Sequence, residues 1–339
     1  MNIRLLGALA LVTALGCESA PSNPGGGGDP DLGGADLTGS GPVFDLSGTP
    51  PQGTTSIAGS ISASRTLSGD VLVTDTVTIE AGVTLTLAPG TTVRVNSTKM
   101  IVVRGTLQAN GTKQAPVNIG SVAGSGVGDW TGIGVASGGT TNLVFTALRN
   151  ATTAFQAAAG SSFDLDAVTI EKSGTGAILN SGGTIRYSAL HGVGQGQSSS
   201  MLYVNDASPK ISDTIIDNGN PGVDLIVVSG ATSGPLFDHV EVTGCHCAFH
   251  LNNGSKITLS GASIHDNVYG MMVVGSKNTV VTGSNFLLNN VNIGTCTSGT
   301  VTSTSNYFIG EIFDASCLGQ TATGAQNQPL ATAGIRPRP

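Results

Sequence analysis

A repeat of about 22 residues in the second half of the chain constrains the fold more than any other feature. The apolar residues that begin successive units are 22, 20, 26, 26, 22 and 22 positions apart, by subtraction of their numbers. These unit starts are Leu143, Leu165, Ile185, Ile211, Phe237, Leu259 and Val281. A fixed period with insertions confined to one place is typical of a solenoid, in which each unit buries the face of the next.

Each unit is built of strands. Apolar and polar residues alternate within the units, as in ITLSGASIHDN at residues 257–267. This period of two places one set of side chains inward and the other outward. Gly, Asn, Ser and Asp recur too often to leave room for a helix of ordinary length. The predicted fold class is therefore all-β: a single-stranded parallel β-helix with about 20–26 residues per coil.

Further columns follow from the unit starts. Five residues after each start comes a second apolar residue: Leu148, Ile170, Leu190, Ile216, Val242, Ile264 and Phe286. Twelve after, in the units without a long insertion, come Phe155, Ala177, Val223, Phe249, Met271 and Ile293. Asn267 and Asn289 lie one period apart, which predicts a ladder of stacked amides, and Cys245 takes the same place one coil earlier.

The region before the repeat carries a family resemblance. Its motifs, in order, are GVTLTLAPGTTV (82–93), GTLQANGT (105–112), APVNI (115–119) and DWTGI (129–133). They resemble the opening coils of bacterial right-handed parallel β-helix proteins of the pectin-lyase-like superfamily. NYFIGEIFD at residues 306–314 resembles the last coil of the same group. The resemblance implies one right-handed β-helix over residues 57–320, and parallel crossovers are generally right-handed.

Residues 1–17 resemble a bacterial lipoprotein signal. Arg4 precedes an apolar run that ends Ala-Leu-Gly-Cys at Cys17, and this run is too short for a stable membrane span. The resemblance implies cleavage before Cys17 and acylation of its thiol and new amino group. Glu18 then points to the outer membrane by family analogy. The alternative is an ordinary secretory signal with an incidental cysteine.

Two segments lie outside the predicted solenoid. Residues 18–56 are dominated by Gly, Pro, Ser and Asp, which cannot bury enough apolar surface to order themselves. We expect a flexible tether that lets the folded body stand off the membrane. Residues 321–339 have no coil pattern and are expected to form a loose tail.

Four cysteines remain after Cys17. In an exported protein an even remainder suggests disulfides, and Cys296–Cys317 would close a loop at the C-terminal end of the stack. Cys245 and Cys247 could be oxidised, reduced or metal ligands. With His250 they resemble metal-ligand spacing, but alternation sends His246 away from both cysteines, so one metal could not easily collect the set.

The net charge and the outward-facing residues of successive coils indicate which functions the chain could have. The net charge of −7, without a basic stripe, argues against nucleic acid as a partner. The resemblance implies that enzymes of this fold carry acids on outward positions of successive coils, yet no outward column here does so. Asp213, His239 and Glu241 remain as candidates for an acid–base or metal site, with Asp224 and His250 on a neighbouring face. Ordinary surface polarity is the interpretation we favour.

The sequence therefore predicts a non-catalytic exported lipoprotein. It would be a rigid scaffold for surface binding or adhesion, with a polysaccharide or a surface protein as partner and no cofactor. The alternative is a polysaccharide lyase or glycoside hydrolase of the same fold. Trp130, the single Trp, is expected to pack over a coil edge and not to serve as a sugar platform.

Overall fold

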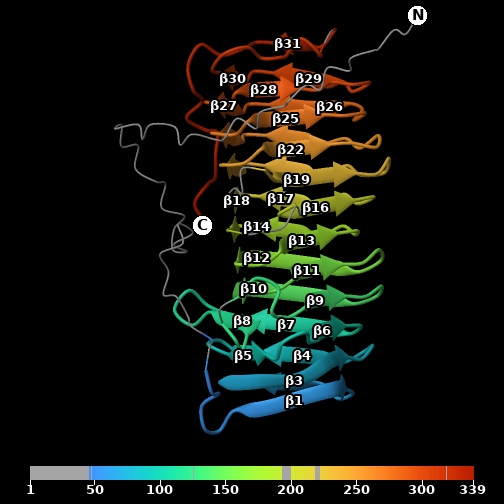
Figure 1. Cartoon of the computed structure of the whole chain (residues 1–339), viewed down its shortest axis with the longest axis vertical. Coiled ribbons are helices and arrows are strands. Elements are labelled where there is room, and N and C mark those ends of the chain that lie inside the picture. The colour runs from blue at the N-terminus through green and yellow to red at the C-terminus, as the bar shows by residue number, and fades with distance from the viewer. Residues whose placement is uncertain (1–45, 47, 125, 193–199, 218–221, 318) are drawn as a thin grey trace, which may run out of the picture.

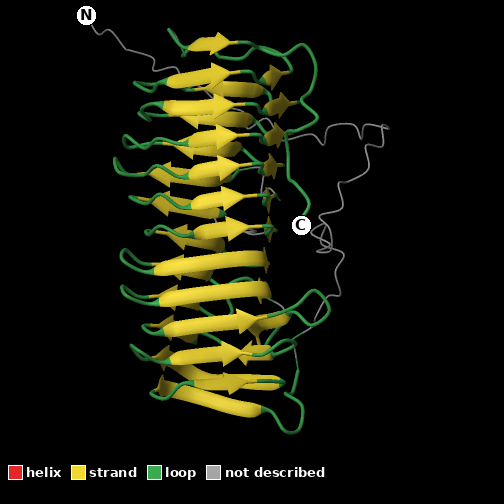
Figure 2. Ribbon diagram, turned by 180° about the vertical axis from the view of Figure 1, so that it is seen from behind, coloured by secondary structure: helices red, strands yellow, loops and turns green. Residues whose placement is uncertain are grey.

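The structure is a computed structural model and describes residues 46, 48–124, 126–192, 200–217, 222–317 and 319–339. The predicted signal, the lipidation site Cys17 and the tether up to residue 45 lie outside the described residues. Within the described ranges there are strands and no helix (Figure 2), so no helix there could cross a membrane. Strands from β1 to β31 stack into one rod of about 11 turns (Figure 1).

The strands are short and follow one another without interruption. The first ten are β1 Thr55–Ile61, β2 Arg65–Leu67, β3 Asp70–Ile79, β4 Thr84–Leu87, β5 Thr92–Val95, β6 Met100–Val103, β7 Thr106–Asn110, β8 Val117–Ser121, β9 Gly132–Val135 and β10 Thr140–Arg149. The next eleven are β11 Thr153–Ala157, β12 Ser162–Glu171, β13 Thr175–Leu179, β14 Thr184–Arg186, β15 Ala189–His191, β16 Leu202–Asn205, β17 Lys210–Ser212, β18 Ile215–Ile216, β19 Asp224–Ser229, β20 Leu236–Asp238 and β21 Glu241–Thr243. The last ten are β22 Cys247–Leu251, β23 Thr258–Ser260, β24 Ser263–His265, β25 Tyr269–Val273, β26 Thr279–Thr282, β27 Asn285–Leu287, β28 Val291–Gly294, β29 Val301–Thr304, β30 Tyr307–Phe308 and β31 Thr321–Thr323.

Three ladders of parallel strands run along the rod. The start ladder contains the unit starts and includes β14, β17, β20, β23, β26 and β29. The flank ladder includes β15, β18, β21, β24, β27 and β30. The broad face includes β13, β16, β19, β22, β25 and β28. The longer strands β10 and β12 contribute to both the start and the flank ladders.

The predicted inward columns are confirmed by the strand register. Leu143 pairs with Leu165, Leu165 with Ile185, and the pattern continues to Val281 without a slip. The second column pairs in the same way from Leu148 to Phe286. Both columns are buried in one core cluster. Because a single coil has no core of its own, this stacking of apolar side chains is what stabilises the fold.

One predicted alignment in the third column is wrong. Val223 was predicted to align with Phe249, but the residue that pairs with Phe249 is Ile226. The unit that starts at Ile211 is 26 residues long, so counting twelve residues from its start stops short of the pairing residue. For the same reason Asp224 pairs with Cys247, and Val227 is the residue that stacks on His250.

Each coil turns from the start ladder to the flank ladder at a single residue with left-handed backbone conformation. The residue two after each unit start has φ between 41° and 60° in all seven units. Only the last two of the seven are glycines, although left-handed conformations are costly for other residues. The next residue is small or β-branched, and Ser188, Thr214 and Ser284 each donate a hydroxyl hydrogen bond to the carbonyl two residues earlier. The corner is thus closed by a local hydroxyl hydrogen bond in the units that carry Ser or Thr at this position.

The predicted asparagine ladder is present inside the next corner. Asn267 Nδ2 donates to Asn289 Oδ1 at 3.0 Å and to the carbonyl of Val242 at 3.2 Å. Asn267 Oδ1 accepts from the backbone N–H and the thiol of Cys245 at 3.3 and 3.0 Å. Both asparagines are buried, so each amide satisfies backbone groups that water cannot reach.

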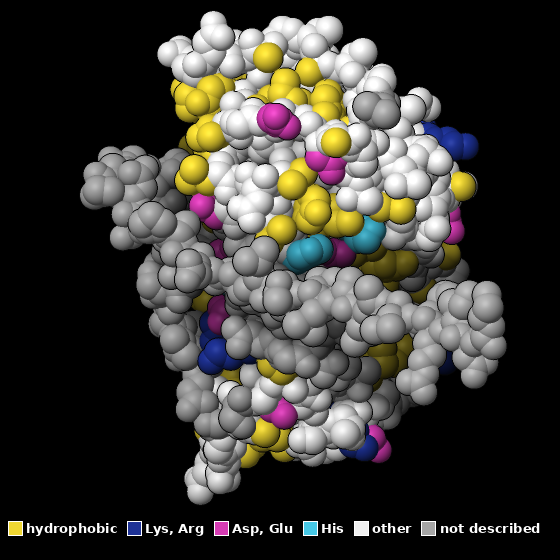
Figure 3. All heavy atoms as spheres, turned by 45° about the horizontal axis from the view of Figure 1, so that its top comes forward, with side chains coloured by type: hydrophobic (Ala, Val, Ile, Leu, Met, Phe, Trp, Pro, Cys, Tyr) yellow, Lys and Arg dark blue, Asp and Glu magenta, His cyan; other side chains and the backbone are white. Residues whose placement is uncertain are grey.

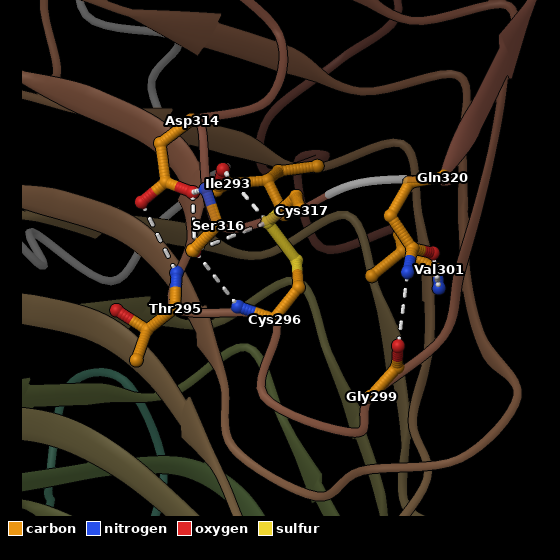
Figure 4. Close-up of a disulfide and its surroundings, with 9 residues drawn as sticks. All are labelled: Ile293, Thr295, Cys296, Gly299, Val301, Asp314, Ser316, Cys317 and Gln320. Carbon is orange, nitrogen blue, oxygen red and sulfur yellow. Dashed lines mark hydrogen bonds between the residues drawn. A yellow bond between two sulfur atoms is a disulfide. The ribbon is translucent and has the colours of Figure 1, made fainter.

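The C-terminal end of the stack is closed by the predicted disulfide, Cys296–Cys317, whose Cα atoms are 4.7 Å apart (Figure 4). β31 pairs with β29, and Gln320, directly before β31, extends that pairing: its Oε1 accepts from Val301 N–H at 2.7 Å and its Nε2 donates to Gly299 C=O at 2.9 Å. An unpaired edge strand can pair with other chains. The side chain of Gln320 therefore occupies backbone groups that another strand would use.

Candidate functional site

Asp213 is paired with an arginine from the C-terminal segment. Its side chain is 2% exposed. Arg336 Nε donates to Asp213 Oδ1 at 2.7 Å, and Arg336 NH2 donates to Asp213 Oδ2 at 2.9 Å. This bidentate arrangement is the strongest ion-pair geometry that a carboxylate can form with a side chain. It raises the pKa of Arg336 further above its ordinary value, against the effect of burial.

The other two predicted residues lie in different networks. His239 Nδ1 is 2.9 Å from Asp238 Oδ1, and Arg336 connects Asp238 to Asp213 through a contact of 3.0 Å. Burial would raise the pKa of Asp238, but hydrogen bonds from Ser260 and His239 and the charge of Arg336 bring it below its ordinary value. Asp213 and His239 thus belong to one network, while Glu241 contacts His265 instead. The structure does not bring the three together.

His265 lies between two carboxylates. Its Nε2 is 3.4 Å from Glu241 Oε1 and its Nδ1 is 2.8 Å from Asp266 Oδ2. Burial alone would lower the pKa of His265, but these two contacts outweigh it and the pKa is raised above 6.5. The charged ring therefore stabilises the fold fully below pH 6.5. This contribution is lost as the pH rises through the raised pKa of the folded state.

The substitution Glu241→Gln should lower the pKa of His265, because it removes the charge that favours the protonated ring. A proton NMR titration of the His265 ring measures this change directly. Glu311→Gln is the matched control, since Glu311 is exposed near the end of the stack and makes no contact with His265. A pKa of His265 that is the same in both variants would contradict the assignment.

The residues that resemble a metal-ligand spacing are divided between the inside and the outside of the coil. Cys245 and Cys247 are buried, whereas His246 and His250 face outward, as alternation predicts. Burial raises the pKa of the Cys247 thiol well above its ordinary value, which favours the protonated thiol. Among the described residues no group of three or more His, Cys, Asp or Glu is arranged to hold a metal ion.

The two outward histidines share a carboxylate. His246 Nδ1 is 3.0 Å from Asp224 Oδ1, and His250 Nδ1 is 2.6 Å from Asp224 Oδ2. Burial would raise the pKa of Asp224, but the hydrogen bonds from His250 and His246 lower it overall. Tyr269 packs edge-on against His246, with ring centroids 5.6 Å apart. The result is a polar and aromatic group fixed on the outer surface of the broad face.

An outward column of larger side chains runs through the same face. In register on five successive coils it contains Ile178, Tyr203, Val227, His250 and Met272. All five are partly exposed. Figure 3 shows histidine side chains beside an acidic side chain, with hydrophobic side chains around them. We call this column the broad-face strip; counting from the unit starts had placed Asp224 in it instead of Val227.

Trp130 is buried in the core and does not form a sugar platform. Its side chain has no exposed surface, and its Nε1 donates to the carbonyl of Arg149 at 2.7 Å. Its backbone bridges to Ala151 in the next coil. The indole therefore packs inside the coil and not over its edge.

The ionic contacts of Arg336 were not found by sequence reasoning. Arg336 and Arg338 belong to a segment that lacks any coil pattern, and their partners are more than 90 residues away. The only available signal was the presence of two arginines in a chain with few basic residues. Comparisons with protein-family profiles, with curated proteins and with solved structures give no match to this chain.

Proposed function

We propose that this chain is a non-catalytic, exported lipoprotein that displays a rigid β-helix of the right-handed, pectin-lyase-like type. In this proposal Cys17 carries the lipid in the outer membrane, and the segment between Cys17 and the start of β1 at Thr55 forms the tether. The folded body then presents the broad face to a polysaccharide or a surface protein. The tether and the anchor are supported by the sequence pattern alone.

The broad-face strip is the observation that carries the proposal. Its five side chains stack on a flat sheet at a spacing of about 4.8 Å, so the strip extends for about 19 Å along the rod. Tyr and Met are enriched where proteins bind other molecules, and a mixture of aromatic and polar groups also suits a sugar chain. Because the sheet is held by the core behind it, the strip needs no rearrangement before it binds.

The candidate catalytic residues support a binding role over the alternative of a lyase or hydrolase. Asp213 is paired with Arg336, His239 with Asp238, and Glu241 with His265. A general acid or base must reach the substrate with a proton to exchange. Each of these groups already has a partner within the protein.

A binding comparison tests the proposal. The full chain with Cys17→Ser is passed over immobilised acidic and neutral polysaccharides and over outer-membrane extract. We expect retention in one of these arms, reduced at least about tenfold by Tyr203→Ser with Met272→Ser. Val280→Ser is the control, since Val280 is 38% exposed on the start ladder. Equal retention of both variants, or release of unsaturated or reducing ends that is lost with Asp213→Ala, would overturn the proposal.

A further inference from the structure

The segment after β31 lies lengthwise across the coils and does not stack on them. Figure 2 shows it as a loop that descends beside the short strands of the flank ladder, ending at the middle of the rod. Leu330 and Asn285 exchange two hydrogen bonds of 2.9 and 3.0 Å. Further along, Gly334 N–H donates to Gly261 C=O at 2.7 Å. We call residues 324–339 the strap.

Arginine side chains hold the far end of the strap. Arg336 binds Asp213 through its backbone N–H and its guanidinium, and it also reaches Asp238. Arg338 NH2 donates to Asp166 Oδ2 at 2.9 Å, and its guanidinium lies 4.2 Å from the centre of the Phe145 ring. Carboxylates from three coils thus meet two guanidinium groups of the strap, in a geometry that lysine cannot reproduce, and Asp166 also accepts from Arg186 NH2 at 3.1 Å.

The surface under the strap combines these acids with a small apolar patch. Ile335 packs against Ala189 and Ile215, and these three residues form a cluster separate from the main core. Ala189 and Ile215 are outward residues of β15 and β18, so their burial depends on what lies over the flank ladder. We call Phe145, Asp166, Ala189, Asp213, Ile215 and Asp238 the acidic flank.

Asp213 shows why this surface selects a cation. Its carboxylate is almost fully buried, and the groups donating to it are the backbone N–H and the guanidinium of Arg336. Removing the strap would leave a carboxylate that must either be rehydrated or meet another cation, because a buried unpaired charge is costly. The strap itself forms no strand over residues 324–339. It is held at a few spaced points, as a bound peptide is.

We propose that the acidic flank is a binding site for an extended peptide that carries two arginines separated by one residue, and that the strap is its resident, displaceable occupant. The apolar residue before the first arginine fills the place of Ile335. The site lies on the flank ladder, so it is independent of the broad-face strip and of the function proposed for it.

The strap competes with any free peptide for the acidic flank, and this competition determines the binding that we expect. A segment tied to its own site acts at an effective concentration of the order of millimolar, so a free peptide cannot easily enter the intact chain. Arg336→Ala with Arg338→Ala removes the anchors but leaves the acidic flank unchanged. The probe is a fluorescent peptide with the sequence of residues 330–339, and its anisotropy is measured with the full chain carrying Cys17→Ser.

We expect the peptide to bind the doubly substituted chain at least about tenfold more tightly than the chain with an intact strap. A peptide with lysine in place of both arginines should bind at least about fivefold more weakly, since the bidentate contacts are lost. Adding Asp213→Asn to the opened chain should weaken binding of the original peptide at least about tenfold. If circular dichroism shows that the variant with Asp213→Asn does not fold, Asp166→Asn takes its place and tests the Arg338 contact.

Three results would overturn the proposal. The first is a peptide that fails to bind the opened, folded chain. The second is equal binding to the opened and intact chains, and the third is binding that survives both acidic-flank substitutions, because the peptide would then be attached elsewhere. None of these results bears on retention by the broad-face strip.

Discussion

Replacing Phe249 by alanine is expected to lower the free energy of unfolding by about 4 kcal/mol. Phe249 has no exposed surface, and its ring meets Phe237 of the start ladder edge-on with centroids 5.0 Å apart. The ring therefore joins two faces of the same coil across the interior. Its removal leaves a cavity that the register of both ladders prevents from collapsing, since each strand is fixed by the coils on either side.

Guanidinium denaturation followed by circular dichroism measures this loss. Val280→Ala is the control, because Val280 is 38% exposed and should change the free energy of unfolding by no more than about 0.5 kcal/mol. The solenoid core described here would be contradicted if the two substitutions had similar effects.

Asn267→Ala is expected to lower the free energy of unfolding by about 3 kcal/mol. The amide of Asn267 satisfies the backbone N–H of Cys245 and the carbonyl of Val242, and no water replaces it at a buried position. Alanine leaves both backbone groups without a hydrogen-bond partner, and each unsatisfied group costs about 1–3 kcal/mol. It also breaks the contact with Asn289, so two adjacent coils lose their polar connection.

The matched control is Asn290→Ala, one residue from the ladder. Asn290 is exposed, so its substitution should leave the free energy of unfolding within about 0.5 kcal/mol of that of the original protein. If Asn267→Ala were as mild as this control, the buried amides would not be a source of stability.

The sequence predicts the parallel stack well because the stack is periodic. Unit starts such as Leu143 and Leu165 occupy equivalent positions, so an error in one unit would conflict with its neighbours. The asparagine ladder and the disulfide follow for related reasons: one from the common spacing, the other from the even number of remaining cysteines in an exported chain. The register failed only at Val223, where an insertion interrupts the count.

The candidate site could not be predicted to the same extent. Period-two alternation describes strands, but Asp213 and His239 lie at left-handed corners, where the alternation is broken. Their partners come from Asp238 and Arg336, and a contact across 123 residues leaves no local pattern. The sequence predicts a loose segment over residues 321–339, and nothing in its composition points to the ion pairs that fasten it to the flank.

The repeated left-handed corner has a consequence for how such a rod can change in length. Since the corner residues of the units beginning at Phe237 and Leu259 have similar φ angles of 54° and 60°, the unit spanning residues 237–258 can stand in for its successor in the stack. An in-frame duplication of one such stretch would lengthen the rod by a single rise of about 4.8 Å and preserve both interfaces that flank it. Growth by whole turns is thus open to this architecture, whereas the gain or loss of one residue at a corner would shift every side chain up to the next loop.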